Sequence, residues 1–192
     1  MVLRDVNEIK ELFPFESDEE LYLLVALARK KHNPHLDKQI VLRTIVHSSD
    51  EWTSKILHLT AEARCHPSRF QLYVTFNPAS ARKAYKLLKE KFAEWDYRND
   101  LLRIKRVESE WMSLLQTPEA AARCQYYLVD VDSCEADDRI QPILRSLAVV
   151  AEAPTFNGKH YLVKPFDVRI LSGVDELEVK KNALFVIGQI EP

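Results

Sequence analysis

Two aspartates separated by a single residue are the side chains best placed to do chemistry. Asp130 and Asp132 end the apolar stretch 125–132, QYYLVDVD, which is typical of a β-strand. Alternate residues of a strand project from one face, so both carboxylates leave the same face about 7 Å apart along the chain, while Val129 and Val131 point toward a core. Such oxygen donors suit Mg²⁺ or Mn²⁺, although strand ends also commonly carry an Asp that caps the next turn.

A histidine at the start of another short strand is the second candidate. Asn157 and Gly158 favour a tight turn, which delivers His160 to the beginning of a strand over 160–164. A single histidine is more often a core or surface residue than a ligand. We nevertheless single it out, because it follows a Gly-containing turn and is expected opposite the strand that ends in the acid pair.

This order of motifs resembles that of the archaeo-eukaryotic primase and primase-polymerase superfamily. Asp130 and Asp132 match its acid pair, and Gly158-Lys159-His160 matches its second motif, with Gly where Ser is usual. The family's third motif is a hydrophobic residue followed by Asp. Phe166-Asp167 has this composition, but it follows the histidine by only seven residues, where the family inserts much more chain. The resemblance covers roughly residues 70–167.

The resemblance implies nucleotidyl transfer. The acid pair would hold Mg²⁺ or Mn²⁺ ions that activate a 3′-hydroxyl and stabilise the leaving pyrophosphate. His160 would contact the phosphates of an incoming nucleoside triphosphate, and Lys159 or Lys164 could add positive charge there. Asp167 is the provisional third carboxylate, and the other candidates for that role are Asp175, Glu176 and Glu178.

One segment concentrates positive charge. Residues 78–106 contain nine Lys or Arg against four acidic residues. Interleaved with Tyr85 and Tyr97, these cations could follow a phosphate backbone, and three of them lie off the apolar helix stripe: Arg82, Lys83 and Lys86. The alternative is a solvated helix face whose lysine stems cover a core.

Composition excludes several classes of protein. The 192 residues include 27 Lys or Arg and 29 Asp or Glu, so no global positive field recruits nucleic acid or an anionic membrane. Only three glycines occur, all in the last 35 positions, which excludes a Walker-type phosphate loop and a G-x-G-x-x-G fingerprint. Three distant cysteines favour a reducing compartment. Without an apolar run of roughly 20 residues or a signal peptide, we expect a soluble, cytoplasmic protein with no membrane partner.

Hydrophobic periodicity predicts interleaved helices and strands. Ser17 and Glu20 have the spacing of a capping box, and the apolar residues after them suggest a helix that ends near His32. Asn77 and Pro78 suggest the start of a second helical region, 78–116. Further helices are expected over 50–64 and from Asp137, and strands over 39–47, 70–76, 125–132, 148–153, 160–164 and 183–190.

These elements predict an α/β or α+β protein, with a mixed sheet and flanking helices. A primase-like α/β unit would precede a C-terminal sheet, built from 125–190, that resembles the RNA-recognition motif (RRM-like). One domain over 1–192 would combine a helical and mixed part, 1–118, with a sheet-rich part, 119–192, that carries the site. The expected function is metal-dependent nucleotidyl transfer on nucleic acid. The alternatives are a catalytically silent member that binds nucleic acid or protein, and a metal-dependent phosphoesterase or nuclease.

Overall fold

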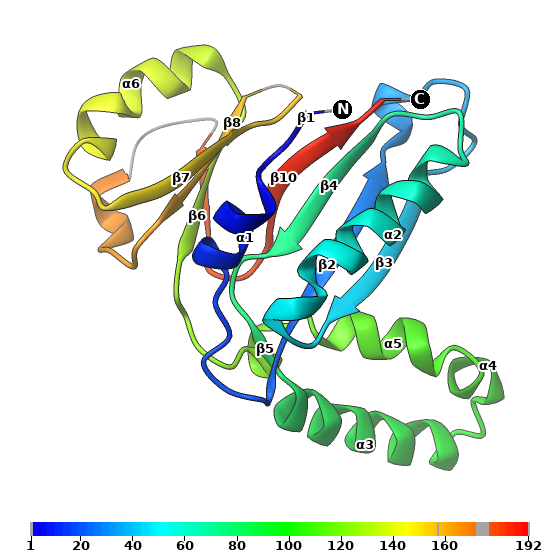
Figure 1. The fold of residues 1–192 in the computed structure, drawn as a ribbon. Helices are drawn as coiled ribbons and strands as arrows, with labels where there is room; N and C mark the ends of the chain where they lie inside the picture. The colour runs from blue at the N-terminus through cyan, green and yellow to red at the C-terminus, as the bar shows by residue number, and fades with distance from the viewer. Residues whose placement is uncertain (1, 157, 172–176, 192) are drawn as a thin grey trace.

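A computed structural model describes residues 2–156, 158–171 and 177–191 of the chain. It confirms the α+β class: two antiparallel sheets lie side by side with helices around them (Figure 1). All of the described strand pairs are antiparallel, in place of the mixed sheet that we expected.

The first sheet joins the two ends of the chain. Its strand order is β1 (Val2–Leu3), β10 (Leu184–Ile190), β4 (Phe70–Thr75), β2 (Glu20–Ala28) and β3 (Ile40–Val46), and β5 (Ala79–Ser80) pairs with the start of β2. The predicted C-terminal sheet over 125–190 is therefore wrong in its last part. Residues 184–190 return to the first sheet, where β10 pairs with β4 and β1.

The second sheet has the order β7 (Val149–Pro154), β8 (Lys159–Val163), β6 (Tyr127–Val131) and β9 (Leu177–Lys180). Helix α6 (Cys134–Leu144) connects β6 to β7, and β8 lies between these two strands. This arrangement is a split β-α-β unit, the building block of ferredoxin-like and RRM-like sheets. A short 3-10 helix, η4 (Val168–Leu171), follows β8.

The two faces of the second sheet have different neighbours. Val129 and Val131 pack with Ile140 and Leu144 of α6 in one apolar cluster. The opposite face contributes Leu128 and other residues to the main core, which it shares with the first sheet and its helices α1 (Val6–Leu12) and α2 (Trp52–Arg64). The alternation predicted for residues 125–132 is therefore present in β6. The face of β6 that carries Asp130 points toward the first sheet.

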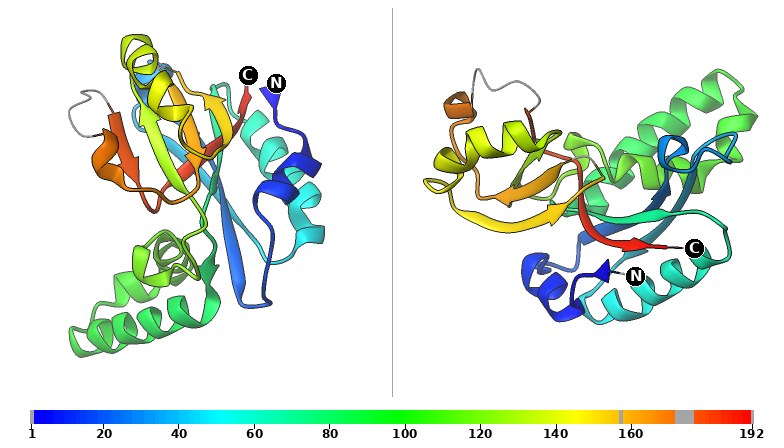
Figure 2. Two further views of the ribbon diagram at one scale, coloured as in Figure 1. Left: turned by 90° about the vertical axis from the view of Figure 1, so that its left-hand side faces the viewer. Right: turned by 90° about the horizontal axis from the view of Figure 1, so that it is seen from above.

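Three helices extend from the lower end of the first sheet as a separate arm (Figures 1 and 2). They are α3 (Ala81–Tyr97), α4 (Leu101–Ile104) and α5 (Val107–Leu114), followed by the 3-10 helix η3 (Pro118–Ala120). Their apolar contacts with one another include Leu88, Trp95 and Leu114. Among the described residues, no helix is long and apolar enough to cross a membrane.

The predicted helix from Ser17 to about His32 is wrong, because residues 20–28 form strand β2. Nearly every position of this segment is apolar, so residues at helical spacing are apolar by coincidence. All but one of its residues are buried, which is typical of a strand covered on both faces. The 3-10 helices η1 (Lys30–His32) and η2 (Ser49–Glu51) flank the connection to β3 and the start of α2.

Asn77 does not cap a helix as predicted. Its buried amide instead donates to the carbonyl oxygens of Tyr126 (3.0 Å) and Lys181 (2.8 Å) and accepts from the backbone N–H groups of Gln125 (2.7 Å) and Tyr126 (3.0 Å). Helix α3 begins later, where Ser80 accepts from Lys83 N–H. Asn77 therefore fixes the segments that enter β6 and β10 to the end of β4.

Candidate active site

A row of three polar residues crosses the inner face of the second sheet. By strand register Asp130 of β6 lies directly opposite His160 of β8 and Glu178 of β9, and directly opposed residues of antiparallel strands share one face. The Asp130 carboxylate meets two cationic or polar partners: His160 Nε2 lies 3.2 Å from Oδ1, and Lys180 Nζ lies 2.7 Å from Oδ2. Lys180 also lies 3.0 Å from Glu178 Oε2.

These partners stabilise the ionised form of Asp130. Burial alone would raise the pKa of this carboxyl, but hydrogen bonds from His160 and Lys180, together with their charges, lower it to about 2. The side chain is only 16% exposed. A largely buried carboxylate is thus held negative at the end of the strand.

Gly158 sets the backbone geometry that brings His160 to Asp130. A Cβ atom at position 158 would lie 1.8 Å from the Val131 carbonyl oxygen, which no real side chain tolerates. The β7–β8 turn therefore approaches β6 more closely than any residue except glycine permits. The Thr155 hydroxyl accepts from Gly158 N–H at 3.0 Å and holds this turn. The close approach of the two strands therefore explains why a glycine occupies position 158 of the predicted second motif.

The first sheet contributes the other wall of the site. Arg29, Lys31 and His32, which follow directly after β2, line one pocket together with Asp130, Asp132 and His160. This pocket encloses about 60 Å³, equivalent to about two water molecules. It is large enough for an ion with one or two water molecules or for part of a phosphate, and a larger ligand must lie at its mouth.

Two buried nitrogen atoms of this pocket have no hydrogen-bond partner within the described part of the chain. They are His160 Nδ1 and Gln71 Nε2. The Gln71 amide is oriented by Tyr73, whose hydroxyl donates to Oε1 at 2.5 Å. Buried polar atoms are almost always paired, commonly with ordered water where the protein offers no partner. Both atoms therefore have the capacity to pair with a water molecule or a ligand.

An aromatic contact joins the two sheets beside the pocket. The rings of His32 and Phe156 stack with centroids 3.8 Å apart. Burial and the neighbouring charges of Lys31 and Arg29 lower the pKa of His32, which favours the neutral ring at pH 7. The stack therefore needs no counter-ion, and it positions the β7–β8 turn over the loop that carries the cations.

The structure brings three of the sequence-predicted site residues together, Asp130, Asp132 and His160, and leaves three others outside the pocket. Because the register pairs Val163 with Tyr127, residues after β8 lie at the opposite end of β6 from Asp130. Asp167 belongs to this distant end, where its carboxylate accepts from Arg169 at 2.6 Å. The two predicted phosphate-binding lysines also point elsewhere: Lys164 Nζ lies 4.6 Å from the Tyr126 ring centroid and Lys159 Nζ lies 6.0 Å from that of Tyr161.

Of the three other candidates for the third carboxylate, only Glu178 lies within the described residues. It lies opposite Asp130 on β9, as the row described above requires. Asp175 and Glu176 lie outside the described residues. Strand register therefore favours Glu178 over Asp167 as the third acidic group, because a directly opposed pair is closer than residues at opposite strand ends.

The predicted nucleic-acid contacts lie on the helical arm, at the other end of β2 from the pocket. Arg82 forms an ion pair with Glu19 at 2.5 Å, and Lys83 Nζ donates to the Ala121 carbonyl at 2.7 Å. Lys86 lies one helical turn further along the same exposed face. Nine residue steps of extended chain lead from Glu20 to Arg29, so this surface and the pocket are roughly 30 Å apart.

Sequence reasoning named Glu178 but missed the contribution of the first sheet and of Lys180 on β9. The signal was present in Arg29-Lys30-Lys31-His32, a run of basic residues directly after an apolar segment. The predicted helix that ends near His32 places these basic residues at a helix terminus. They can face the second sheet only because the segment before them is a strand of the first sheet. Lys180 gave no sequence signal, because its role depends on the pairing of β9 with β6.

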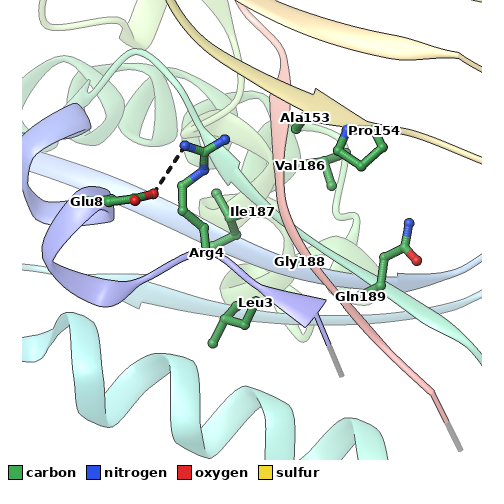
Figure 3. A pocket seen from close by; sticks show the side chains of 9 residues that line it. All are labelled: Leu3, Arg4, Glu8, Ala153, Pro154, Val186, Ile187, Gly188 and Gln189. Atoms are coloured by element: carbon green, nitrogen blue, oxygen red, sulfur yellow. Dashed lines mark hydrogen bonds and ion pairs between the residues drawn. The ribbon is translucent and has the colours of Figure 1, made fainter.

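A larger and more apolar pocket adjoins the site (Figure 3). It encloses about 350 Å³ between β1, β10 and β7, and Ala153 in its wall is the register partner of His160. Arg4 crosses this pocket, where it contacts Glu8 at 3.4 Å and donates to the Glu152 carbonyl at 2.5 Å. This contact ties the first sheet to the edge of the second. No pair of carboxylates occurs among its lining residues, so the polar pocket is the stronger candidate for chemistry.

The donor set fits a divalent cation that also binds phosphate. Carboxylate oxygens are the ligands that Mg²⁺ and Mn²⁺ prefer, and Mg²⁺ is commonly held by one or two carboxylates plus substrate phosphates. Within the described residues, no three His, Cys, Asp or Glu side chains form a ready-made ligand set. Asp130 and Asp132 would supply two ligands of such an ion, and water or a bound phosphate would supply the others.

Comparisons with family models, with curated proteins and with solved structures returned no match to this chain.

Proposed function

We propose that this protein is a divalent-metal-dependent nucleotidyltransferase of the primase-polymerase type, which uses nucleoside triphosphates and acts on nucleic acid. The observation that carries the proposal is the convergence of Asp130, Asp132 and His160 on one pocket whose opposite wall bears Arg29 and Lys31. Acidic groups for a cation and basic groups for phosphate are both needed to bind a triphosphate with its metal. The split β-α-β topology of the second sheet supports the likeness to that family.

Each group has a role that its position suggests. Asp130 and Asp132 hold the Mg²⁺ or Mn²⁺, and Glu178 adds negative charge beside them. When bound, the cation neutralises charge on the transferred phosphate and activates the attacking hydroxyl. Arg29 and Lys31 bind the triphosphate oxygens from the first sheet, because their cationic groups complement its charge. His160 donates to Asp130 through Nε2, so in the doubly protonated form of the ring its second nitrogen, Nδ1, which has no partner in the described structure, is the one that would donate to a phosphate oxygen.

Nucleic acid would approach along the first sheet from the helical arm. The roughly 30 Å between α3 and the pocket corresponds to about nine base pairs of duplex at 3.4 Å per step. Arg82, Lys83 and Lys86 would contact the backbone there, while the strand end reaches the pocket. The net charge of −2 makes this interaction depend on local charge.

The test is an assay of products. Full-length protein is incubated with a labelled primer-template, Mn²⁺ and nucleoside triphosphates, and we expect extended primers. The double variant Asp130→Asn with Asp132→Asn and the single variant Glu178→Gln should lose extension. Asp167→Asn is the matched control and should keep it, because Asp167 follows β8 at the opposite end of β6 from Asp130, whereas Glu178 lies directly opposite Asp130. Shortened strands in place of extended ones would identify a phosphoesterase or nuclease and contradict the proposal.

A second function, binding without catalysis, is favoured by one observation. Lys180 already neutralises Asp130, with Nζ 2.7 Å from Oδ2, so the carboxylate has a partner in the absence of metal. In that case the protein would bind nucleotide or nucleic acid with its own cations. Nucleotide binding that is unaffected by chelation of divalent metals, together with no extended product, would establish this alternative.

A further inference from the structure

The Lys180 ammonium group occupies the space between two carboxylates on neighbouring strands. Its Nζ atom lies 2.7 Å from Asp130 Oδ2 and 3.0 Å from Glu178 Oε2. The strand register explains this placement, because Asp130 faces Glu178 while Lys180 faces Leu128, one step diagonal to the acid. Lys180 is 30% exposed and is not one of the residues that line the pocket, so its ammonium group reaches Asp130 from β9 beside the pocket.

A divalent cation that binds Asp130 must compete for the same oxygen atoms. An ammonium group and a metal ion within a few ångströms repel each other, so both cannot keep full contact with Asp130. Lys180 carries its charge on a flexible four-carbon chain, which lets the ammonium group move to another anion nearby. Asp132 has a different position, since it is exposed in the same pocket and has no part in this contact.

We propose that Lys180 is an internal competitor of the divalent cation at Asp130, and that a bound triphosphate relieves this competition. Phosphate oxygens give the displaced ammonium group a new anionic partner, while the same phosphates complete the ligand set of the cation. Metal and nucleotide therefore bind cooperatively, and each favours the binding of the other by the same factor. This inference rests on the proposed function, because it assumes that the pocket takes both ligands.

Two further observations agree with a site that is completed only by nucleotide. Over the described residues, the acids provide no ready-made set of three metal ligands. His160 and Gln71, each of which has a buried nitrogen without a partner in the described structure, are also among the residues that line this pocket. Both features indicate that metal alone leaves the site incomplete.

The experiment measures Mn²⁺ affinity of the full-length protein by electron paramagnetic resonance, with and without a non-hydrolysable nucleoside triphosphate analogue. For the unmodified chain we expect weak binding of Mn²⁺ alone and a tightening of about tenfold or more with the analogue, within the usual range of coupling. Lys180→Met should bind Mn²⁺ alone about tenfold more tightly and should lose most of the coupling. Lys164→Met is the matched control, since Lys164 lies over Tyr126, and should behave as the unmodified chain.

The possible failures can be told apart. Equal Mn²⁺ affinity in the unmodified chain and Lys180→Met would overturn the competition, even if both proteins bind Mn²⁺ with nucleotide and the proposed function stands. Mn²⁺ binding that survives in the Asp130→Asn, Asp132→Asn variant would instead contradict the proposed site itself. If Lys180→Met does not fold, as judged by circular dichroism, Lys180→Gln removes the same charge and replaces it in the test.

Discussion

Two carboxylates, the buried Glu20 and the largely buried Asp130, lie near cations in this molecule, and their surroundings differ. Arg123 contacts Glu20 through Nε (2.8 Å) and Nη2 (3.3 Å), and the second Glu20 oxygen also accepts from Glu16 N–H at 2.8 Å. The Arg123 guanidinium further donates to the Pro14 carbonyl at 2.8 Å. This pair is closed, because both oxygens of the buried carboxylate are satisfied by the protein.

The Asp130 pair has the same charges, and both Asp130 oxygens also have partners in the protein, but the groups around it are less complete. Its neighbour His160 keeps a buried nitrogen without a partner in the described structure, and Asp132 is exposed beside it. The cation of each pair contacts a second carboxylate, Glu178 for Lys180 and Glu16 for Arg123. Arginine fixes a carboxylate with a planar fork, whereas lysine is a mobile point charge. The contrast suggests that Glu20 with Arg123 maintains the fold, and that Asp130 with Lys180 is arranged to exchange partners.

The largest effect on stability should come from removing the cation of the Glu20–Arg123 pair. Arg123→Met leaves Glu20, 3% exposed, as an unpaired buried charge, so the free energy of unfolding should fall by about 4 kcal/mol. Lys180→Met should cost about 1 kcal/mol, because Lys180 is more exposed and Asp130 keeps His160. Urea unfolding measures both variants. Equal losses would remove the distinction between the two pairs.

Gly158→Ala should lower the free energy of unfolding by about 3 kcal/mol, somewhat less than Arg123→Met. The added methyl group meets the Val131 carbonyl at 1.8 Å, so β6 and the β7–β8 turn must separate. Because this contact holds His160 beside Asp130, nucleotide affinity should fall as well. Gly188→Ala serves as a control for glycine substitution on a strand of the first sheet. A Gly158→Ala protein with unchanged stability and binding would show that the close approach does not position the site.

Lowering the pH should remove about 2 kcal/mol of stabilisation that the ionised Asp130 carboxylate gives the folded state. Its pKa is about 2 in the folded protein and 3.8 ordinarily, so the unfolded chain takes up a proton first as the pH falls. The stabilisation is present above about pH 5 and mostly lost near pH 2. Urea unfolding of the unmodified chain and of Asp130→Asn at both pH values isolates it. A parallel pH dependence in the two proteins would mean that Asp130 is not held ionised by its partners.

The smallest effect on stability is expected on the helical arm. Reversing Arg82, Lys83 and Lys86 to Glu should change the free energy of unfolding by about 0.5 kcal/mol or less, because these side chains lie at the surface. Nucleic-acid binding, which should be weak and strongly salt-dependent, should be abolished. The loss should appear with duplexes longer than about nine base pairs and be small with shorter ones, which cannot reach from the pocket to α3. Length-independent binding would place the nucleic-acid contact elsewhere.

The sequence sufficed for the part of the site that depends on local alternation. Strand parity predicted that Asp130 and Asp132 share a face opposite Val129 and Val131, and the turn before His160 marked the start of the neighbouring strand. Helix α2 and strands β3, β4, β6, β7, β8 and β10 also lie within a few residues of the predicted elements.

The missing parts depend on pairing between distant segments. Residues 20–28 are apolar at almost every position, so their period cannot separate a helix from a strand buried on both faces. The basic residues after them, Arg29 and Lys31, could not be assigned to the site without that strand. The return of 184–190 to the first sheet and the pairing of Glu178 with Asp130 likewise follow from tertiary contacts that no local pattern records.

Thermal unfolding with Mn²⁺ and a nucleoside triphosphate tests the central claim most directly, namely that the Asp130 pocket binds both together. At about one hundred times the dissociation constant, binding stabilises the folded state by about 2.7 kcal/mol, which should raise the Tm by roughly 5 to 10 °C. The Asp130→Asn, Asp132→Asn variant should stay folded and lose this shift, while His160→Ala should keep the response to metal and lose most of the response to nucleotide. The absence of any shift in the unmodified chain at millimolar Mn²⁺ and nucleotide, or an equal shift in the double variant, would contradict the account.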